Sequence, residues 1–151
     1  GLGGGAERMV GAHARVAGGG SRMGFPEPGW ATVPAGGGMV CRPRQIPDAH
    51  AMELLLTAEP IPVERALALG LVNRVVPDKR VEDEAYATAR RIAEGAPLVN
   101  RWHKQFIERL AVSAELAPEE WDEGFECFDT EDCREGVAAF LAKRKPDFKG
   151  R

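Results

Sequence analysis

A run of glycines followed by a glutamate stands near the start of the sequence, at residues 3–7 (GGGAE). Glycines at the start of a helix leave backbone N–H groups unobstructed, and such groups can bind an anion or an oxyanion. A second carboxylate, Glu27, stands between two prolines, which restrict the backbone on both sides of it. Two carboxylates and an oxyanion donor are sufficient for proton transfer next to a carbonyl group.

Taken alone, these residues also fit a simpler interpretation. A glycine turn followed by glutamate is typical of a helix start, and a glutamate between prolines is typical of a loop. The pattern becomes specific through the motifs that follow it. These are residues 34–38 (PAGGG), 42–44 (RPR), 54–57 (LLLT), 68–77 (ALGLVNRVVP), 130–132 (TED), 135–136 (EG) and 139–146 (AFLAKRKP).

In this order, the motifs resemble the enoyl-CoA hydratase/isomerase (crotonase) family, and the resemblance extends over all 151 residues. Enzymes of this family bind an acyl-CoA and stabilise the enolate of its thioester with two backbone N–H groups, of which Gly4 matches the second. Glu7 matches the carboxylate that activates water for attack on the β-carbon. Glu27 matches the carboxylate that delivers a proton to the α-carbon. The resemblance also implies substrate contacts for Pro34, Ala35, Phe140 and Lys143, the last two at the adenine and phosphate end of CoA.

The presence of both glutamates favours one reaction within the family. Syn addition of water needs two groups on one face of the double bond, whereas an isomerase commonly keeps one acid–base residue. The resemblance therefore implies an enoyl-CoA hydratase, with CoA entering as part of the substrate, no separate cofactor and no metal. The alternatives are an isomerase or another acyl-CoA enzyme of the family, a non-catalytic assembly module, and a truncated remnant.

The elements that must position these groups fall into two regions. Residues 1–78 are expected to form an α/β region, part of the β-β-α spiral core of the crotonase fold. Residues 79–151 are expected to form the C-terminal helices of the oligomerisation region, which in this family build trimers, often paired as hexamers. The pattern predicts helices over 7–14, 51–56, 63–69, 81–94, 97–111, 118–128 and from Thr130 to the basic residues 143–145, and strands over 15–17, 22–25 and 71–76.

Single residues mark several of these boundaries. Gly70 stands where a C-terminal glycine cap belongs, and Pro97 stands where proline favours the first turn of a helix. Thr130 is a good N-cap for the last helix. That helix carries an apolar stripe at helical spacing, formed by Cys133, Val137, Phe140 and Leu141.

Parts of the family's site are expected to lie upstream of this chain, which starts at Gly1 rather than Met. The resemblance places the first oxyanion donor in an earlier loop, together with most core strands and much of the CoA-binding surface. We therefore expect the chain to be the rear portion of a larger enzyme, with little or no activity by itself.

Four positions depart from the family's usual pattern. Arg8 stands where relatives usually carry an apolar residue, and its burial beside Glu7 would be costly. Ala58 stands in place of a usual glycine. The others are His13 and Cys41.

Composition excludes several other classes of protein. The formal net charge of −3 gives no indication of a nucleic-acid partner, and no apolar run approaches the roughly 18–20 residues of a membrane span. The 3 cysteines are odd in number and widely spaced, which favours free thiols in a reducing cytoplasm over a disulfide framework. The histidines show no spacing typical of metal ligands.

Overall fold

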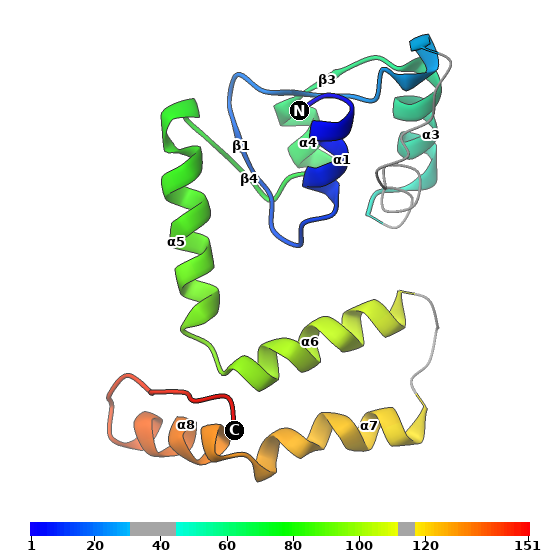
Figure 1. Ribbon diagram of the computed structural model, residues 1–151. Helices are drawn as coiled ribbons and strands as arrows, with labels where there is room; N and C mark the ends of the chain where they lie inside the picture. Colours follow the sequence, from blue (N-terminus) through cyan, green and yellow to red (C-terminus); the bar gives the residue numbers. More distant parts are fainter. Residues whose placement is uncertain (31–44, 112–116) are drawn as a thin grey trace. The chain divides into compact units, whose positions relative to one another are not determined.

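The chain, as a computed structural model, is described over residues 1–30, 45–111 and 117–151. It divides into two compact units, an N-terminal unit (Gly1–Tyr86) and a C-terminal unit (Ala87–Arg151). Figure 1 shows short helices and strands in the first unit and longer helices in the second. The predicted division after residue 78 concerns a core part and an oligomerisation part, and that assignment stays a prediction.

The N-terminal unit alternates short helices with short strands. Its described elements are α1 (Gly4–Val10), β1 (Val16–Gly18), β2 (Arg22–Met23), the 3-10 helix η1 (Glu27–Trp30), α3 (Asp48–Thr57), β3 (Ile61–Pro62), α4 (Val63–Ala68), β4 (Arg74–Val76), the 3-10 helix η2 (Asp78–Arg80) and the start of α5 (Val81–Ala93).

Two small sheets connect segments that are distant in the sequence. Strand β1 pairs in parallel with β4, with Val16 opposite Arg74 and Gly18 opposite Val76. Strand β2 pairs antiparallel with β3. Because a parallel pair needs a crossover connection, the chain between β1 and β4 must leave the first strand and return alongside it.

The first helix begins earlier and ends earlier than predicted. It was expected over residues 7–14, but α1 runs from Gly4 to Val10. Gly3 caps it with a backbone φ of +53°, a region that favours glycine, and Glu7 N donates a 3.0 Å hydrogen bond to Gly3 O. At the other end Gly11 follows Val10, and glycine is a poor helix former. The glycines therefore build the first turn.

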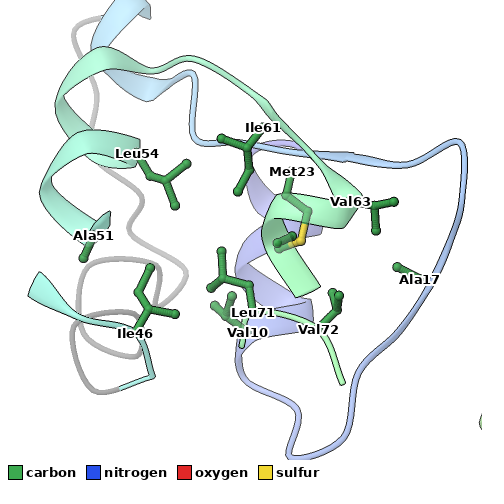
Figure 2. Packing of buried hydrophobic residues seen from close by; sticks show 11 residues of the cluster. Val10, Ala17, Met23, Ile46, Ala51, Leu54, Ile61, Val63, Leu71 and Val72 are labelled. Atoms are coloured by element: carbon green, nitrogen blue, oxygen red, sulfur yellow. The ribbon is translucent and has the colours of Figure 1, made fainter. Parts of the chain in front are cut away.

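The core of the N-terminal unit is assembled from most of its elements. Figure 2 shows side chains from α1, the strands, α3, α4 and the turns meeting in one cluster. Burying one Val or Leu side chain contributes about 1.5–3 kcal/mol, so this cluster is what holds the short elements together. Its members are Val10, Ala17, Met23, Ile46, Ala51, Leu54, Ile61, Val63, Ala66, Leu71 and Val72.

Helix α4 ends with the glycine cap that the sequence predicts. Gly70 has a φ of +81°, Gly70 N donates to Leu67 O at 3.0 Å, and Leu71 N donates to Ala66 O at 2.8 Å. This pairing of the last carbonyls is the Schellman motif. It occupies the N–H of Leu71, so the strand predicted over 71–76 is shorter and begins only at Arg74.

Arg15 joins the turn after α1 to the end of α4. Its guanidinium donates from Nε to Leu71 O at 2.6 Å, from Nη1 to Ala12 O at 2.5 Å and from Nη2 to Gly70 O at 3.2 Å. The side chain is buried, and this desolvation lowers the pKa of Arg15 below its ordinary value. The cation therefore satisfies carbonyls left over at a helix C-terminus, where positive charge is favoured.

The C-terminal unit is helical where it is described. It contains the end of α5, α6 (Pro97–Leu110), α7 (Pro118–Phe125), the 3-10 helix η3 (Glu126–Asp129) and α8 (Glu131–Leu141). Pro97 begins α6 as predicted, and the segment predicted as one helix over 118–128 changes to a 3-10 helix after Phe125. None of the helices in these described ranges is long and apolar enough to cross a membrane.

The last helix starts as predicted but ends early. Thr130 caps it, since Cys133 N donates to Thr130 Oγ1 at 3.0 Å. The helix was expected to reach the basic residues, but it ends at Leu141, and Lys143 has a φ of +51° outside it. Part of the predicted apolar stripe is exposed, with Phe140 at 82%. Among the described residues of this helix, the buried ones are Asp132 and Ala139.

Candidate active site

The two predicted glutamates are held by adjacent backbone segments. Gly3 N donates to Gly24 O at 3.2 Å and Gly24 N donates to Gly1 O at 3.3 Å, and Leu2 forms a parallel bridge with Gly24. The segment that leads into α1, and so to Glu7, is therefore fixed beside the segment that leads into Glu27. This pairing across the chain is what brings the two motifs into one site.

Glu27 lies at the start of the helix that carries Glu7. A Cβ atom built on Gly3 would lie 3.5 Å from Glu27 Oε1, so the Glu27 carboxylate packs against the residue that caps α1. Gly24 is equally constrained, because a Cβ there would lie 2.9 Å from the backbone Cα of Pro60. The glycines thus allow the close approach of backbone and carboxylate.

Both carboxylates are removed from solvent. Glu7 is 7% exposed and Glu27 is 9% exposed, whereas glutamates are rarely buried in proteins. Burying an ionisable group is costly unless it is paired or hydrogen-bonded. Two buried carboxylates near one helix start are typical of a functional site.

Gly4 begins α1 and is exposed. Within the described part of the chain its N–H has no acceptor, as expected for the first residue of a helix. Among the described residues, no atom lies within 4 Å of the position that a Cβ would take on Gly4 or Gly5. The oxyanion role of Gly4 stays a prediction.

The departures from the family pattern fall at different places. Arg8 is exposed, so the predicted free-energy cost of burying a cation beside Glu7 does not arise. His13 is exposed as well. Ala58 ends α3 in a left-handed conformation with a φ of +57°. Cys41 lies outside the described residues.

Of the four residues predicted to contact the substrate, the structure describes two. Pro34 and Ala35 lie outside the described residues. Phe140 and Lys143 belong to the C-terminal unit, where both side chains are exposed.

A hollow of about 240 Å³ in the N-terminal unit contains neither glutamate. It is lined by parts of α1, β1 and β2, including Met9, Ala17 and Met23, and by Asp78 and Val81. Its position along β1 gives it no acid–base group of the predicted site. The predicted acid–base residues therefore lie at the helix start and not in this hollow. Among the residues that the structure covers, no three His, Cys, Asp or Glu side chains gather as a metal site would require.

Two buried charged residues were missed by the sequence analysis. Arg15 caps α4 from more than 50 residues away in sequence, as its contact with Leu71 shows (|i−j| = 56). The other is Asp132, which is 3% exposed. Its carboxylate accepts hydrogen bonds from Lys149 N and Gly150 N, near the end of the chain. A local signal could have found neither, because both roles depend on partners distant in sequence.

Comparison with known proteins shows the family of the chain. The profile of the enoyl-CoA hydratase/isomerase family matches residues 1–151. A probable enoyl-CoA hydratase of Bacillus subtilis is 36% identical over 155 aligned positions, covering 99% of this chain and 59% of the relative. A short-chain-enoyl-CoA hydratase of Clostridium acetobutylicum is 37% identical, again covering 99% of this chain and 59% of the relative.

A solved structure is similar over almost the whole chain. An enoyl-CoA hydratase/carnithine racemase of Magnetospirillum magneticum superimposes with a TM-score of 0.91 at 40% identity, covering 99% of this chain and 56% of that one. The predicted crotonase-like α/β fold is thereby confirmed, and the chain spans about three-fifths of the length of the curated relatives it matches (59%). The chain belongs to the enoyl-CoA hydratase/isomerase family.

Proposed function

We propose that this chain supplies the acid–base half of an enoyl-CoA hydratase, which adds water to a 2-enoyl-CoA. The observation that carries the proposal is the position of Glu27. Its carboxylate packs against Gly3, the cap of the helix on which the buried Glu7 lies. Two buried glutamates brought to one helix start suit a reaction that needs both a base and an acid.

In the proposed reaction, Glu7 takes a proton from water as the water oxygen forms a bond to the β-carbon of the substrate. The π bond between the α- and β-carbons breaks, and its electron pair moves toward the thioester carbonyl. The Gly4 N–H stabilises the negative charge on that carbonyl oxygen. The protonated Glu27 then gives its proton to the α-carbon, and a proton returns from Glu7 to Glu27 to restore the starting state.

Recognition of the substrate is proposed to use the CoA portion, so the reaction needs no separate cofactor. Lys143 is exposed, and in the described residues no carboxylate lies within ion-pair distance of it, which suits a phosphate ligand. Phe140 is 82% exposed and offers an aromatic face to an adenine ring. The likeness to named hydratases supports an acyl-CoA substrate, and a cytoplasmic location is part of the proposal.

The proposed assembly is a homotrimer or a hexamer. Exposed apolar side chains in the C-terminal unit support it, since Phe125, Phe128 and Phe140 are 59%, 64% and 82% exposed. Large exposed apolar groups in one region mark an interaction surface. Light scattering after size-exclusion chromatography tests this, and a strict monomer at micromolar concentration would count against it.

The catalytic proposal is tested by hydration of crotonyl-CoA, followed as loss of enoyl-thioester absorbance. The assay uses the protein that contains this chain, with the variants Glu7→Gln and Glu27→Gln. We expect each variant to lose activity about 10²–10⁴-fold, the usual contribution of a general acid or base. The matched control is Glu64→Gln, an exposed glutamate in α4. Unchanged turnover in both site variants would show the assignment to be wrong.

A further inference from the structure

The last ten residues fold back along α8. We call residues 142–151 the return segment, and Figure 1 shows it doubling back so that the C-terminus ends near the start of α8. The Glu135 carboxylate of α8 accepts two hydrogen bonds from the Arg144 guanidinium, of 2.6 and 2.7 Å. The same carboxylate accepts a bond of 2.9 Å from Asp147 N. One turn of the helix therefore holds two points of the return segment.

A second carboxylate of α8 fixes the end of the return segment. Asp132 is 3% exposed, and its two oxygens accept hydrogen bonds from Lys149 N at 2.7 Å and Gly150 N at 2.8 Å. Its own N–H donates to Arg151 O at 3.0 Å. Hydrogen bonds to an ionised carboxylate are about twice as strong as neutral ones, so Asp132 is a second strong attachment of the segment, and it is buried.

The return segment carries five cationic side chains, and four of them are neutralised within the unit. The four ion pairs are Arg144 with Glu135, Lys145 with Glu94, Lys149 with Asp147, and Arg151 with Glu131.

Lys143 differs from the other cations of the return segment. Over the described ranges of the chain it has no carboxylate partner, and it is exposed. Its φ of +51° lies in the left-handed region, which is unfavourable for a lysine. The backbone on both sides is fixed, since Lys143 N donates to Phe140 O at 3.2 Å and Arg144 N donates to Ala139 O at 3.0 Å. These two bonds are the carbonyl pairing that closes α8, so the end of the helix itself sets this conformation.

We propose that Asp132 is a positioning residue for an anion-binding group, Lys143. By anchoring the far end of the return segment, Asp132 keeps Arg144 on Glu135 and Arg151 on Glu131, so that neither carboxylate is free to pair with the Lys143 ammonium group. The ligand class is a phosphate group, and this inference rests on the proposed function, in which that phosphate belongs to CoA. Glu135 assists by holding the middle of the segment.

The test compares CoA binding by calorimetry in the protein that contains this chain and in its Asp132→Asn, Lys143→Ala and doubly substituted variants. Asparagine keeps the size of aspartate but places an amide donor against a backbone N–H. We expect Asp132→Asn to weaken CoA binding about tenfold and to speed amide exchange at Lys149 and Gly150. Asp129→Asn, an exposed aspartate three positions upstream, is the matched control and is expected to change neither.

The double substitution separates positioning from general stability. If Asp132 acts through Lys143, then Asp132→Asn has no further effect on CoA binding once Lys143 is alanine. Additive losses, or equal CoA binding by the unaltered protein and Asp132→Asn, overturn the positioning role alone. Absence of CoA binding by the unaltered protein overturns both this inference and the proposed CoA contact of Lys143. If Asp132→Asn fails to fold, Glu135→Gln tests the same coupling.

Discussion

Glu27 Oε1 lies 3.5 Å from the point where a Cβ atom would stand on Gly3, the residue that caps the helix of Glu7. The contact joins a residue of the glycine run to the carboxylate between two prolines, which are otherwise separate motifs. Any change that adds bulk or alters the backbone at Gly3 therefore acts on both glutamates.

Gly3→Ala is the first prediction. Gly3 has φ +53° and ψ −133°, a conformation that L side chains rarely adopt, so alanine costs about 1–3 kcal/mol there. We expect a lower free energy of unfolding together with loss of hydration, because the helix start and the Glu27 contact shift. Urea unfolding and the crotonyl-CoA assay measure the two effects.

The control for this variant is Gly29→Ala, where a Cβ would meet no atom of the described residues within 4 Å. It makes the same chemical change two residues after Glu27 without positive φ. Equal effects of the two substitutions would show that the Gly3 conformation is not what matters.

Arg15→Lys is the second prediction. The planar guanidinium of Arg15 donates to three carbonyls. The compact ammonium group of a lysine cannot reach all three. Leaving the buried Leu71 carbonyl without a donor costs about 1–3 kcal/mol. We therefore expect the free energy of unfolding to fall by that amount in chemical denaturation. Arg90→Lys, on the exposed surface of α5, is expected to change it by less than about 0.5 kcal/mol. Matching values for the two variants would contradict the capping role.

Ala58→Gly is the third prediction, and unlike the first two substitutions it should stabilise the folded protein. Ala58 ends α3 with φ +57°, where a Cβ is unfavourable by about 1–2 kcal/mol. Glycine relieves this strain but adds flexibility to the unfolded chain, so we expect a net gain of about 0.5–1 kcal/mol. Thermal unfolding measures it. The same substitution at Ala85, within the right-handed helix α5, is expected to destabilise the protein. A loss of stability at both positions would show the interpretation to be wrong.

Helix ends marked by local signals could be predicted from the sequence. Thr130 and Gly70 satisfy backbone groups within a few residues of themselves, so their roles follow from residue type and position. The end of α8 could not be predicted in this way. It is closed by the same carbonyl pairing as α4, but Lys143 rather than a glycine takes the left-handed position, so no residue type marks this end.

The candidate site was predictable in its residues but not in its contacts. Glu7 and Glu27 could be singled out by type, neighbours and resemblance, and the structure finds both of them buried. Which glycine touches the carboxylate could not be read from the sequence, because it follows from the bridge between Leu2 and Gly24. The catalytic roles of both glutamates stay predictions.

The pH dependence of the return segment is the fourth prediction. Hydrogen bonds from Arg144 and from Asp147 N lower the pKa of Glu135 from its ordinary 4.5 to about 2. A carboxyl group whose pKa is lower in the folded state stabilises that state above the unfolded pKa. Its contribution is therefore complete above about pH 4.5 and is lost as the pH falls toward about 2.

The measurement is the difference in thermal midpoint between the unaltered protein and Glu135→Gln at pH 7, 4 and 2. We expect the unaltered protein to melt higher at pH 7, by a small margin because the pair is at the surface. That margin should shrink at pH 4 and vanish near pH 2, because Glu135 is then protonated and, like glutamine, uncharged. Added salt should reduce the margin at pH 7, because dissolved ions screen an ion pair at the surface. Glu126→Gln in η3, an exposed glutamate, is the matched control, and its margin should stay near zero throughout. A Glu135 margin that is constant with pH, or that grows toward acid, would mean that the charge of Glu135 does not hold the return segment.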